Sequence, residues 1–337
     1  WVDNGFTTTI NNNTMDVQYD GIYARDGSFL TINNNEINDF EERGIDFYSS
    51  ENSTVNYNRI ITNVSTGDWK NGIGNWDNSQ NAVVNYNYIE INSSYGAVGI
   101  EVHGSEIKFD SVLVEAVGSC WGSSASAIYA NESTIEDNYI EIAKQDCSSS
   151  RQGYGIQSWS NSTNRSSIKN NQIYANERTK GIWASYSDIE NNQIEESASG
   201  NQYGAYAIGH GDYNVIRNNT IVDMEHGIYA DDRWDNVIDS NTINVSNWGI
   251  YANNAKGTHT ITNNYINKTG GDKLLHVTNT DSVIVTNNTF LSTAGDGFYF
   301  SNTYVDVRYN LLTTPGRGIH CENQVGGEIG NNTMISN

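Results

Sequence analysis

Apolar and polar positions follow a short phrase that returns along the whole chain, every 21 to 33 residues. The phrase consists of Ile or Val, two variable residues, Asn, one further variable residue and an apolar residue, and its first copy runs from Ile10 to Met15. It occurs fourteen times, with Asp110 replacing Asn in one copy. A period of this size without helical spacing predicts a solenoid. The closing apolar residues are Met15, Ile37, Ile60, Ile89, Val112, Ile140, Ile173, Ile194, Ile221, Ile243, Ile266, Phe290, Leu312 and Met334.

Each phrase predicts a strand, a sharp corner and a second strand. Its two apolar residues would point inward, and Asn suits the corner because it tolerates left-handed backbone angles. Amides stacked on one another can also form a ladder. A second corner is predicted where Gly precedes an apolar residue, as at Gly21-Ile22 and Gly249-Ile250. We therefore predict an all-β, single-stranded parallel β-helix of about 14 coils with an Asn ladder. Right-handed winding is favoured because coil lengths vary. Leu is too scarce for a leucine-rich repeat, and helical periodicity is absent.

The phrases Asn-Asn-x-Ile and Gly-Ile-Tyr-Ala resemble the parallel β-helix repeat family. That family includes pectate-lyase-like enzymes, phage tailspikes, copper-maturation β-helix proteins and large surface proteins of archaea and bacteria. The resemblance covers the whole chain and implies the fold. It leaves the function open, because this scaffold hosts lyases, hydrolases, epimerases, adhesins and inert spacers.

One repeat system without a linker predicts a single domain over residues 1–337. The repeat begins at Ile10 and ends at Met334, so we expect no caps of the domain's own. Exposed strand edges at the ends of a solenoid template association. The expected partners are therefore a longer parent chain or further copies stacked end to end.

Charge narrows the class of partner. Lys and Arg number 18 against 40 Asp and Glu, a net charge of −22. Nucleic acid is excluded as a partner, because phosphate contacts need basic residues. An acidic surface rich in Asn, Ser and Thr favours an extracellular or cell-surface location. No apolar run is long enough to span a membrane.

Modification sites are consistent with that location. Asn-x-Ser/Thr acceptors in predicted turns or loops are the glycosylation candidates: Asn52, Asn63, Asn92, Asn131, Asn161 and Asn164. Cys120 and Cys147 occupy nearly the same place in neighbouring predicted coils, which predicts a disulfide and an oxidising compartment. The alternative is two buried thiols. Cys321 is predicted to be a lone core or corner residue.

Insertions before the Gly corner lengthen four successive coils and would form one flank of loops. Long loops on a rigid scaffold commonly carry binding sites. The alternative is unconstrained drift in loop length. This predicted loop patch carries Trp69, Tyr95, Trp121 and Tyr154.

A column of rings is the second candidate site. The residue after the corner apolar residue should face solvent, and it is aromatic or His in every coil from Tyr229 onward. Sugar rings stack on aromatic faces, so the column predicts glycan binding; the alternative is that like side chains stack and stabilise the solenoid. Its members are Tyr23, Tyr129, Trp183, Tyr229, Tyr251, His276, Tyr299 and His320, of which Trp183, Tyr229, Tyr251 and Tyr299 are the glycan-binding candidates.

A cluster of titratable residues is the catalytic candidate: His210, Asp212, Asp231, Asp232, Arg233 and Asp235. Carboxylates with His and Arg suit glycoside hydrolysis or lyase chemistry on uronates. Gly209-His210-Gly211 and Asp231-Asp232 resemble motifs of polygalacturonase-like hydrolases, although the two occur here in the reverse order. No cofactor is expected other than Ca²⁺, which Asp231, Asp232 and Asp235 could bind instead.

The leading interpretation is therefore a glycosylated extracellular or cell-surface structural β-helix: a stalk, a surface-layer element or a filament subunit. A polysaccharide lyase, hydrolase or tailspike-like depolymerase is the first alternative. A glycan-binding adhesin is the second.

Overall fold

The chain is described here from a computed structural model. The structure describes residues 2–3, 7–27, 29–63, 69–75, 80–117, 125–145, 153–176, 179–196, 206–209, 211–231 and 234–336. It divides into two compact units, Trp1–Lys180 and Gly181–Asn337. Regular structure in these ranges is β-strand throughout, and they contain no helix able to cross a membrane.

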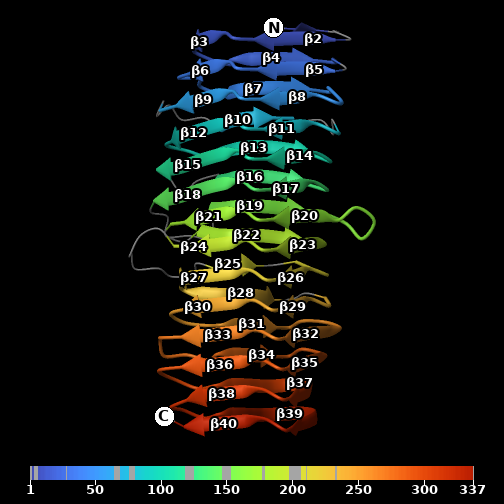
Figure 1. The fold of residues 1–337 in the computed structure, drawn as a ribbon, viewed down its shortest axis with the longest axis vertical. Coiled ribbons are helices and arrows are strands. Elements are labelled where there is room, and N and C mark those ends of the chain that lie inside the picture. The colour runs from blue at the N-terminus through green and yellow to red at the C-terminus, as the bar shows by residue number, and fades with distance from the viewer. Residues whose placement is uncertain are drawn as a thin grey trace. The chain divides into compact units, whose positions relative to one another are not determined.

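In the first unit the strands form three sets, each stacked in parallel (Figure 1). The first set is β1 (Val2–Asp3), β4 (Ile22–Arg25), β7 (Arg43–Tyr48), β10 (Lys70–Gly74), β13 (Ala97–His103), β16 (Ala125–Asn131) and β19 (Gly153–Trp159). The second set is β2 (Thr8–Asn11), β5 (Leu30–Asn33), β8 (Thr54–Asn56), β11 (Val83–Asn85), β14 (Glu106–Lys108), β17 (Thr134–Glu136) and β20 (Ser166–Lys169). The third set is β3 (Thr14–Asp16), β6 (Glu36–Asn38), β9 (Arg59–Thr62), β12 (Tyr88–Ser93), β15 (Ser111–Val117), β18 (Tyr139–Gln145) and β21 (Gln172–Ala175).

The second unit repeats this arrangement. Its first set is β22 (Thr179–Ser185), β25 (Tyr206–Gly209), β28 (His226–Asp231), β31 (Ile250–Asn253) and β34 (Leu275–Thr278). Its second set is β23 (Ser187–Glu190), β26 (Val215–Arg217), β29 (Val237–Asp239), β32 (Thr258–Thr262) and β35 (Ser282–Thr286). Two long strands, β37 (Phe298–Arg308) and β39 (Ile319–Gly330), run through both of these sets. Its third set is β24 (Gln193–Glu195), β27 (Thr220–Met224), β30 (Thr242–Val245), β33 (Tyr265–Lys268), β36 (Thr289–Ser292), β38 (Leu311–Thr314) and β40 (Thr333–Ser336).

The fold is a right-handed parallel β-solenoid, which confirms the predicted class. Each sequence repeat ends in a strand of the third set. The turns number about 12, slightly fewer than the fourteen predicted. The first sequence repeat adds only the two-residue strand β1 to the first strand set. In the last two repeats, β37 and β39 each replace a strand of the first set and a strand of the second set by one continuous strand.

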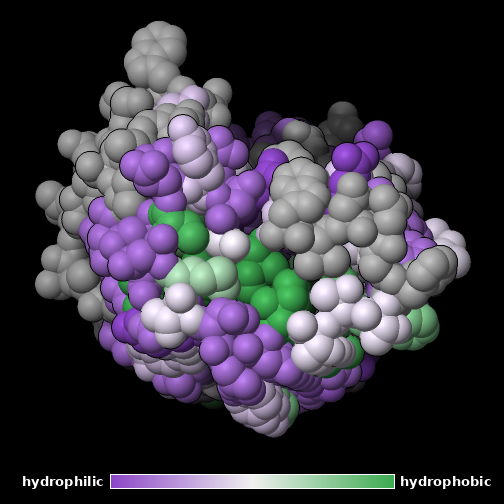
Figure 2. Space-filling model, turned by 90° about the horizontal axis from the view of Figure 1, so that it is seen from above, coloured by the Kyte–Doolittle hydropathy of each residue, from purple (hydrophilic) through white to green (hydrophobic). Residues whose placement is uncertain are grey.

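Identical apolar side chains stack along the core. Ile37, Ile60 and Ile89 are in register in β6, β9 and β12, and each is fully buried. Burying one such side chain contributes roughly 1.5–3 kcal/mol. Viewed end-on from above the N-terminus, Figure 2 shows apolar side chains at the centre, surrounded by hydrophilic residues. The periodic pattern therefore placed the core correctly.

The predicted Asn ladder is present in both units. The backbone N–H of Asn58 and its Nδ2 both donate to Oδ1 of Asn87, each at 3.0 Å, and Nδ2 also donates to the carbonyl of Ile32 at 2.8 Å. Asn241 donates in the same way to Asn264, at 2.9 and 3.0 Å. These amides are buried. Each rung therefore satisfies its buried donors and is tied to the next coil.

The sequence predicted the left-handed backbone conformation for the ladder Asn, and this prediction is wrong. The residue before the ladder Asn has that conformation instead. The N–H of the ladder Asn must point along the stack to the next Oδ1, so the preceding residue makes the turn. The residues concerned have φ between 54° and 60° in all fourteen copies. They are Asn12, Asn34, Tyr57, Tyr86, Phe109, Asp137, Asn170, Asn191, Asn218, Ser240, Asn263, Asn287, Tyr309 and Asn331.

Glycine at the second corner is required by close packing. A Cβ on Gly44 would lie 2.6 Å from the carbonyl oxygen of Gly72 and 2.5 Å from Cγ2 of Ile60. The conformational freedom of glycine is not the reason, because Gly44 does not have a positive φ. The next coil and the core side chain approach too closely for any larger residue.

Asp110 is the one exception in the ladder. Its Oδ1 accepts from the backbone N–H of Asn87 at 2.6 Å and from Nδ2 of Asn87 at 2.9 Å, and its own N–H donates to Asn138 Oδ1 at 2.9 Å. Its Oδ2 is buried and has no hydrogen-bond partner among the described residues. Burial raises the pKa of Asp110 well above the ordinary value, although the hydrogen bonds from Asn87 lower it.

Candidate functional site

The outward face of the first strand set carries two columns of side chains. One column lies one residue after the corner apolar residue, and the other lies two residues before it. In the first unit Tyr23, Asp46, Gly74 and Glu101 are in register in the former column. We call this surface the two-column face. The ring-column prediction covered only one column, and counting back two residues from each corner would have found the other.

An acidic cluster occupies this face in the first unit: Asp20, Arg43, Asp46, Asn71 and Glu101. Arg43 Nη1 donates to Asp46 Oδ2 at 2.5 Å, and Asn71 Nδ2 donates to Glu101 Oε2 at 2.8 Å. The Asn71 amide lies over Gly74, where a Cβ would be 2.8 Å from its Nδ2. Gly74 thus leaves room for the amide between the rungs of Asp46 and Glu101.

Burial sets the protonation of this cluster. It raises the pKa of Asp46 to about 6, against the lowering effect of Arg43. Burial also raises the pKa of Glu101; the hydrogen bond from Asn71 lowers it, and the charge of Asp46 raises it. Oδ1 of Asp46 and Oδ1 of Asn71 are buried with no hydrogen-bond partner in the described ranges. The cluster can therefore take up a proton near neutral pH.

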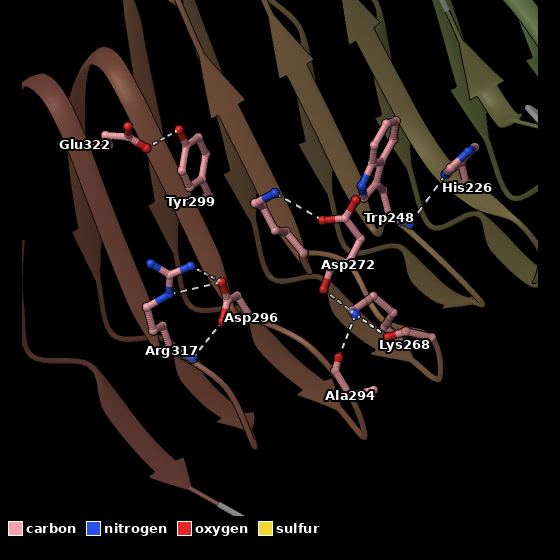
Figure 3. A network of polar contacts seen from close by, with 11 residues as sticks. His226, Trp248, Lys268, Asp272, Ala294, Asp296, Tyr299, Arg317 and Glu322 are labelled. Carbon is pink, nitrogen blue, oxygen red and sulfur yellow. Dashed lines mark hydrogen bonds and ion pairs between the residues drawn. The ribbon is translucent and has the colours of Figure 1, made fainter.

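A row of rings occupies the same face in the second unit, and Figure 3 shows polar contacts around Tyr299 and Trp248. Tyr229 and Tyr251 stack with centroids 5.1 Å apart and planes at 5°. His276 lies 4.9 Å from Tyr251 at 75° and 4.9 Å from Tyr299 at 80°. Trp248, in the neighbouring column, stacks on Tyr251 at 4.7 Å. The rings therefore largely contact one another.

Polar groups beside the ring row are paired. The hydroxyl of Tyr299 donates to Glu322 at 2.7 Å, and Arg317 Nη2 lies 3.0 Å from Asp296 Oδ2. Lys273 Nζ lies 3.1 Å from Asp272 Oδ1 and 5.0 Å from the Tyr299 ring centroid. These pairs fix the side chains of the row in place.

Two basic groups of the second unit have lowered pKa values: His276 on this face and Lys268 at the end of β33 in the third strand set. Burial, aided by the charge of Lys273, lowers the pKa of His276 to about 4, so its ring is neutral at pH 7. Burial lowers the pKa of Lys268 to about 8. The Lys268 ammonium donates to the carbonyls of Gly270, Asp272 and Ala294 at 2.5, 2.5 and 2.7 Å. Lys268 therefore holds the adjoining turns together.

The glycan-binding candidates differ in exposure. Trp183 is only 8% exposed, contrary to the expectation that it faces solvent, because its ring lies over Gly209 in the next coil. Tyr229, Tyr251 and Tyr299 are half-buried. Glycan binding by this column stays a prediction.

The catalytic candidates are only partly described. His210, Asp232 and Arg233 lie outside the described residues, as does the side chain of Asp231. Asp212 Oδ1 accepts from the backbone N–H of Trp234 at 2.9 Å, and Asp235 Oδ1 accepts from that of Thr258 at 2.5 Å. Both described carboxylates therefore cap backbone groups. Within the ranges given above, no three His, Cys, Asp or Glu side chains are grouped to hold a metal ion.

The predicted loop patch is also incomplete. Trp121, Cys120 and Cys147 lie outside the described residues, so the disulfide stays a prediction. The Trp69 indole N–H is buried. The N–H of Tyr95 donates to Ser93 Oγ at 3.2 Å, and the Tyr154 ring lies 5.5 Å below Lys180 Nζ. Cys321 is exposed and therefore not a core residue.

Four of the six glycosylation candidates lie outside the strands, as predicted, whereas Asn92 lies in β12 and Asn131 ends β16. Asn52, Asn63, Asn161 and Asn164 are exposed, while Asn92 and Asn131 are half-buried. Asn131 Oδ1 accepts from the N–H of Trp159 at 2.7 Å. Exposure makes the other four residues the more accessible acceptors, although the Nδ2 groups of Asn161 and Asn164 donate to Glu132.

Comparison with known proteins agrees with the fold. The family described as "Right handed beta helix region" matches residues 165–276 and 203–337, which together span half of the chain. No curated protein matches the sequence. Among solved structures, the A-module of mannuronan C-5 epimerase AlgE6 from Azotobacter vinelandii is similar, with 12% identity and a TM-score of 0.44 over 99% of this chain and 91% of that one. PfbA, a surface adhesin of Streptococcus pneumoniae, has 12% identity and a TM-score of 0.35 over 98% and 85%.

Proposed function

The chain belongs to the right-handed β-helix family, and from this premise we propose that it is a structural element of the extracellular space or cell surface. Its role would be that of a stalk, a surface-layer element or a filament subunit. The amide ladder carries the proposal. Within each unit it ties successive coils through buried side-chain and backbone hydrogen bonds, as between Asn58 and Asn87 and between Asn241 and Asn264.

The polar groups of the two-column face support the same role. Tyr299, Arg317 and Lys273 each pair with a neighbouring carboxylate, and Asp212, which lies outside this face, caps a backbone N–H. These groups contribute to rigidity. The charge of −22 supports an extracellular surface, since it keeps a rigid solenoid soluble and disfavours nucleic acid.

Limited surface proteolysis of the producing cells tests the location, combined with electron microscopy of the purified protein. We expect the protein to be cleaved on intact cells and to form elongated particles or filaments. Recovery only from the cell interior would refute the proposal. Glycans are expected at Asn52, Asn63, Asn161 or Asn164, and mass spectrometry of tryptic peptides before and after deglycosylation tests them.

Polysaccharide cleavage is the second candidate, and the acidic cluster favours it. Asp46 would serve as a general acid, because its pKa of about 6 keeps part of it protonated near neutral pH. Glu101 lies two rungs away, roughly 9.6 Å by rung spacing, close to the span of about 6.5–9.5 Å used by inverting glycosidases. Release of reducing ends from a panel of polysaccharides, lost in Asp46→Asn, would support this function. Absence of turnover on every polysaccharide would exclude it.

A further inference from the structure

Three aromatic side chains occupy a backbone position that disfavours them. At the left-handed position before each ladder Asn, ten of the fourteen sequence repeats have Asn, Asp or Ser. Three successive coils of the first unit instead carry Tyr57, Tyr86 and Phe109, with φ of 56°, 59° and 57°. A bulky residue at positive φ is a conformational outlier, and outliers of this kind gather at ligand-binding positions. We call these three side chains the aromatic ridge.

Burial of the rings does not compensate for this unfavourable backbone conformation. Tyr57 is 57% exposed, and Tyr86 and Phe109 are each 46% exposed. The rings contact one another: Tyr57 and Tyr86 stack at 4.9 Å and 3°, and Tyr86 and Phe109 at 5.0 Å and 10°. Asn would serve the corner with less strain and less exposed apolar surface, as it does in other coils. The ridge therefore calls for an explanation beyond folding.

The ridge lies where one strand set turns into the next, at the corners β8–β9, β11–β12 and β14–β15 (Figure 1). Hydrogen-bonding side chains flank it. Arg59 follows the first corner and pairs with Glu36 at 2.9 Å. Lys108 precedes the third corner and lies 3.3 Å from both Glu106 and Glu136. The surface is thus a line of rings one side chain wide between polar borders.

We propose that the aromatic ridge binds a linear, uncharged polysaccharide whose chain runs along the stack of coils. The ring spacing of 4.9–5.0 Å is close to the rise per sugar of an extended β-1,4-linked chain. Sugar C–H groups pack against the ring edges and the outer faces of Tyr57 and Phe109. The hydroxyls of Tyr57 and Tyr86 both donate and accept hydrogen bonds, which suits sugar hydroxyls.

Charge and size select this ligand over others. The net charge of −22 disfavours acidic polymers as ligands. Three half-exposed rings present on the order of 300 Å² of accessible surface. A specific protein–protein interface buries about 800 Å² of accessible surface on each partner. The width and the regular spacing of the aromatic ridge therefore suit a linear polysaccharide better than a protein surface.

Isothermal titration calorimetry with hexamers of β-1,4-linked glucose, N-acetylglucosamine, mannose and xylose tests the proposal. We expect saturable binding of at least one hexamer, little changed by added NaCl. The triple substitution Tyr57→Asn, Tyr86→Asn and Phe109→Asn should weaken it at least tenfold while the circular dichroism spectrum and cooperative unfolding persist. Tyr309→Asn is the matched control, because Tyr309 has φ of 59° and is 60% exposed but belongs to the second unit and not to the ridge. It should bind as the wild type does.

Three results would overturn the proposal. The first is that the wild type binds none of the hexamers, or that the triple variant binds as tightly as the wild type. The second is loss of folding in the triple variant, which would give the ridge a structural role. The third is a change in sedimentation on triple substitution without glycan binding, which would assign the ridge to a protein contact.

Discussion

Replacing Asp110 by Asn should stabilise the first unit at neutral pH. Oδ2 of Asp110 occupies the place where every Asn rung has its Nδ2 donor, and it is buried with no hydrogen-bond partner among the residues described. In the neighbouring rung, Asn138 Nδ2 donates to Asn171 Oδ1 at 3.0 Å and to the carbonyl of Ile107 at 3.1 Å. Asp110→Asn should restore the corresponding pair of bonds.

The magnitude follows from these contacts. Two hydrogen bonds contribute about 1 kcal/mol each, and relief of a buried, unsatisfied carboxylate oxygen adds roughly 1–3 kcal/mol. We therefore expect a gain of about 3–5 kcal/mol at pH 7. The first unit, Trp1–Lys180, falls in the size class in which 1 kcal/mol shifts the melting temperature by about 2–4 °C, so the melting temperature should rise by roughly 6–20 °C.

The pH dependence gives the sharper test. The folded-state pKa of Asp110 is raised, so the folded wild type binds a proton more tightly than the unfolded chain. Its stability is fully present below the unfolded carboxyl pKa of about 3.9 and falls as the pH rises through the higher folded value. The gain from Asp110→Asn should therefore be largest at pH 7 and shrink toward pH 4, where the protonated carboxyl can itself donate.

Urea denaturation followed by Trp fluorescence at pH 4, 5, 6 and 7 measures this gain. Asn87→Asp is the mirror control, because it places a second carboxylate next to Asp110 and should destabilise the protein most at pH 7. Equal midpoints for Asp110→Asn and the wild type at pH 7 would contradict the reasoning. So would a gain that is constant from pH 4 to pH 7.

Four further predictions follow from the same contacts. Asn264→Ala removes a buried rung and should destabilise the second unit by about 2–4 kcal/mol, measured by urea denaturation. Asp46→Asn should flatten the stability profile between about pH 4 and 7, because the raised pKa of Asp46 makes the wild type lose on the order of 2–3 kcal/mol as the pH rises through 6; an unchanged profile from pH-dependent melting would contradict this. Tyr309→Asn should raise the melting temperature by relieving a left-handed aromatic residue worth about 1 kcal/mol, and a lower value would count against the strain argument. Gly44→Ala should lower the melting temperature, since the new Cβ would lie 2.6 Å from the carbonyl oxygen of Gly72. An unchanged melting temperature would show that the coils can move apart.

The sequence was informative wherever one inward position repeats. Ile60 and Ile89 could be placed in the core, and Asn58 and Asn87 in a ladder, because parallel stacking brings equivalent positions of successive repeats into contact. The phrase alone therefore predicted strands, corners and the ladder. The sequence also showed that Asp110 replaces Asn in one copy of the phrase. It could not show that Oδ2 of Asp110 is buried without a hydrogen-bond partner among the described residues, because that depends on the packing around the side chain.

The outward face was harder to predict, because its contacts join different positions of different coils. Asn71 reaches Glu101 only because Gly74 lacks a side chain, and Trp183 is covered for a similar reason at Gly209. The left-handed residue was assigned one position too late, since both Asn residues of an Asn-Asn pair suit that conformation. The position before the ladder Asn is also where Tyr57, Tyr86 and Phe109 stand. The sequence analysis did not single out these three aromatic residues.

Constant register allows coils of unequal length to stack without error. Ile37 meets Ile60 after 23 residues, and Ile60 meets Ile89 after 29, yet all three side chains share one buried line. The extra residues of the longer coil leave this register unchanged. A change in loop length in one coil is thus not transmitted to the next. Segments could accordingly be lengthened, shortened or exchanged one coil at a time, so evolution and protein engineering can remodel the rim of this scaffold while its interior stays the same.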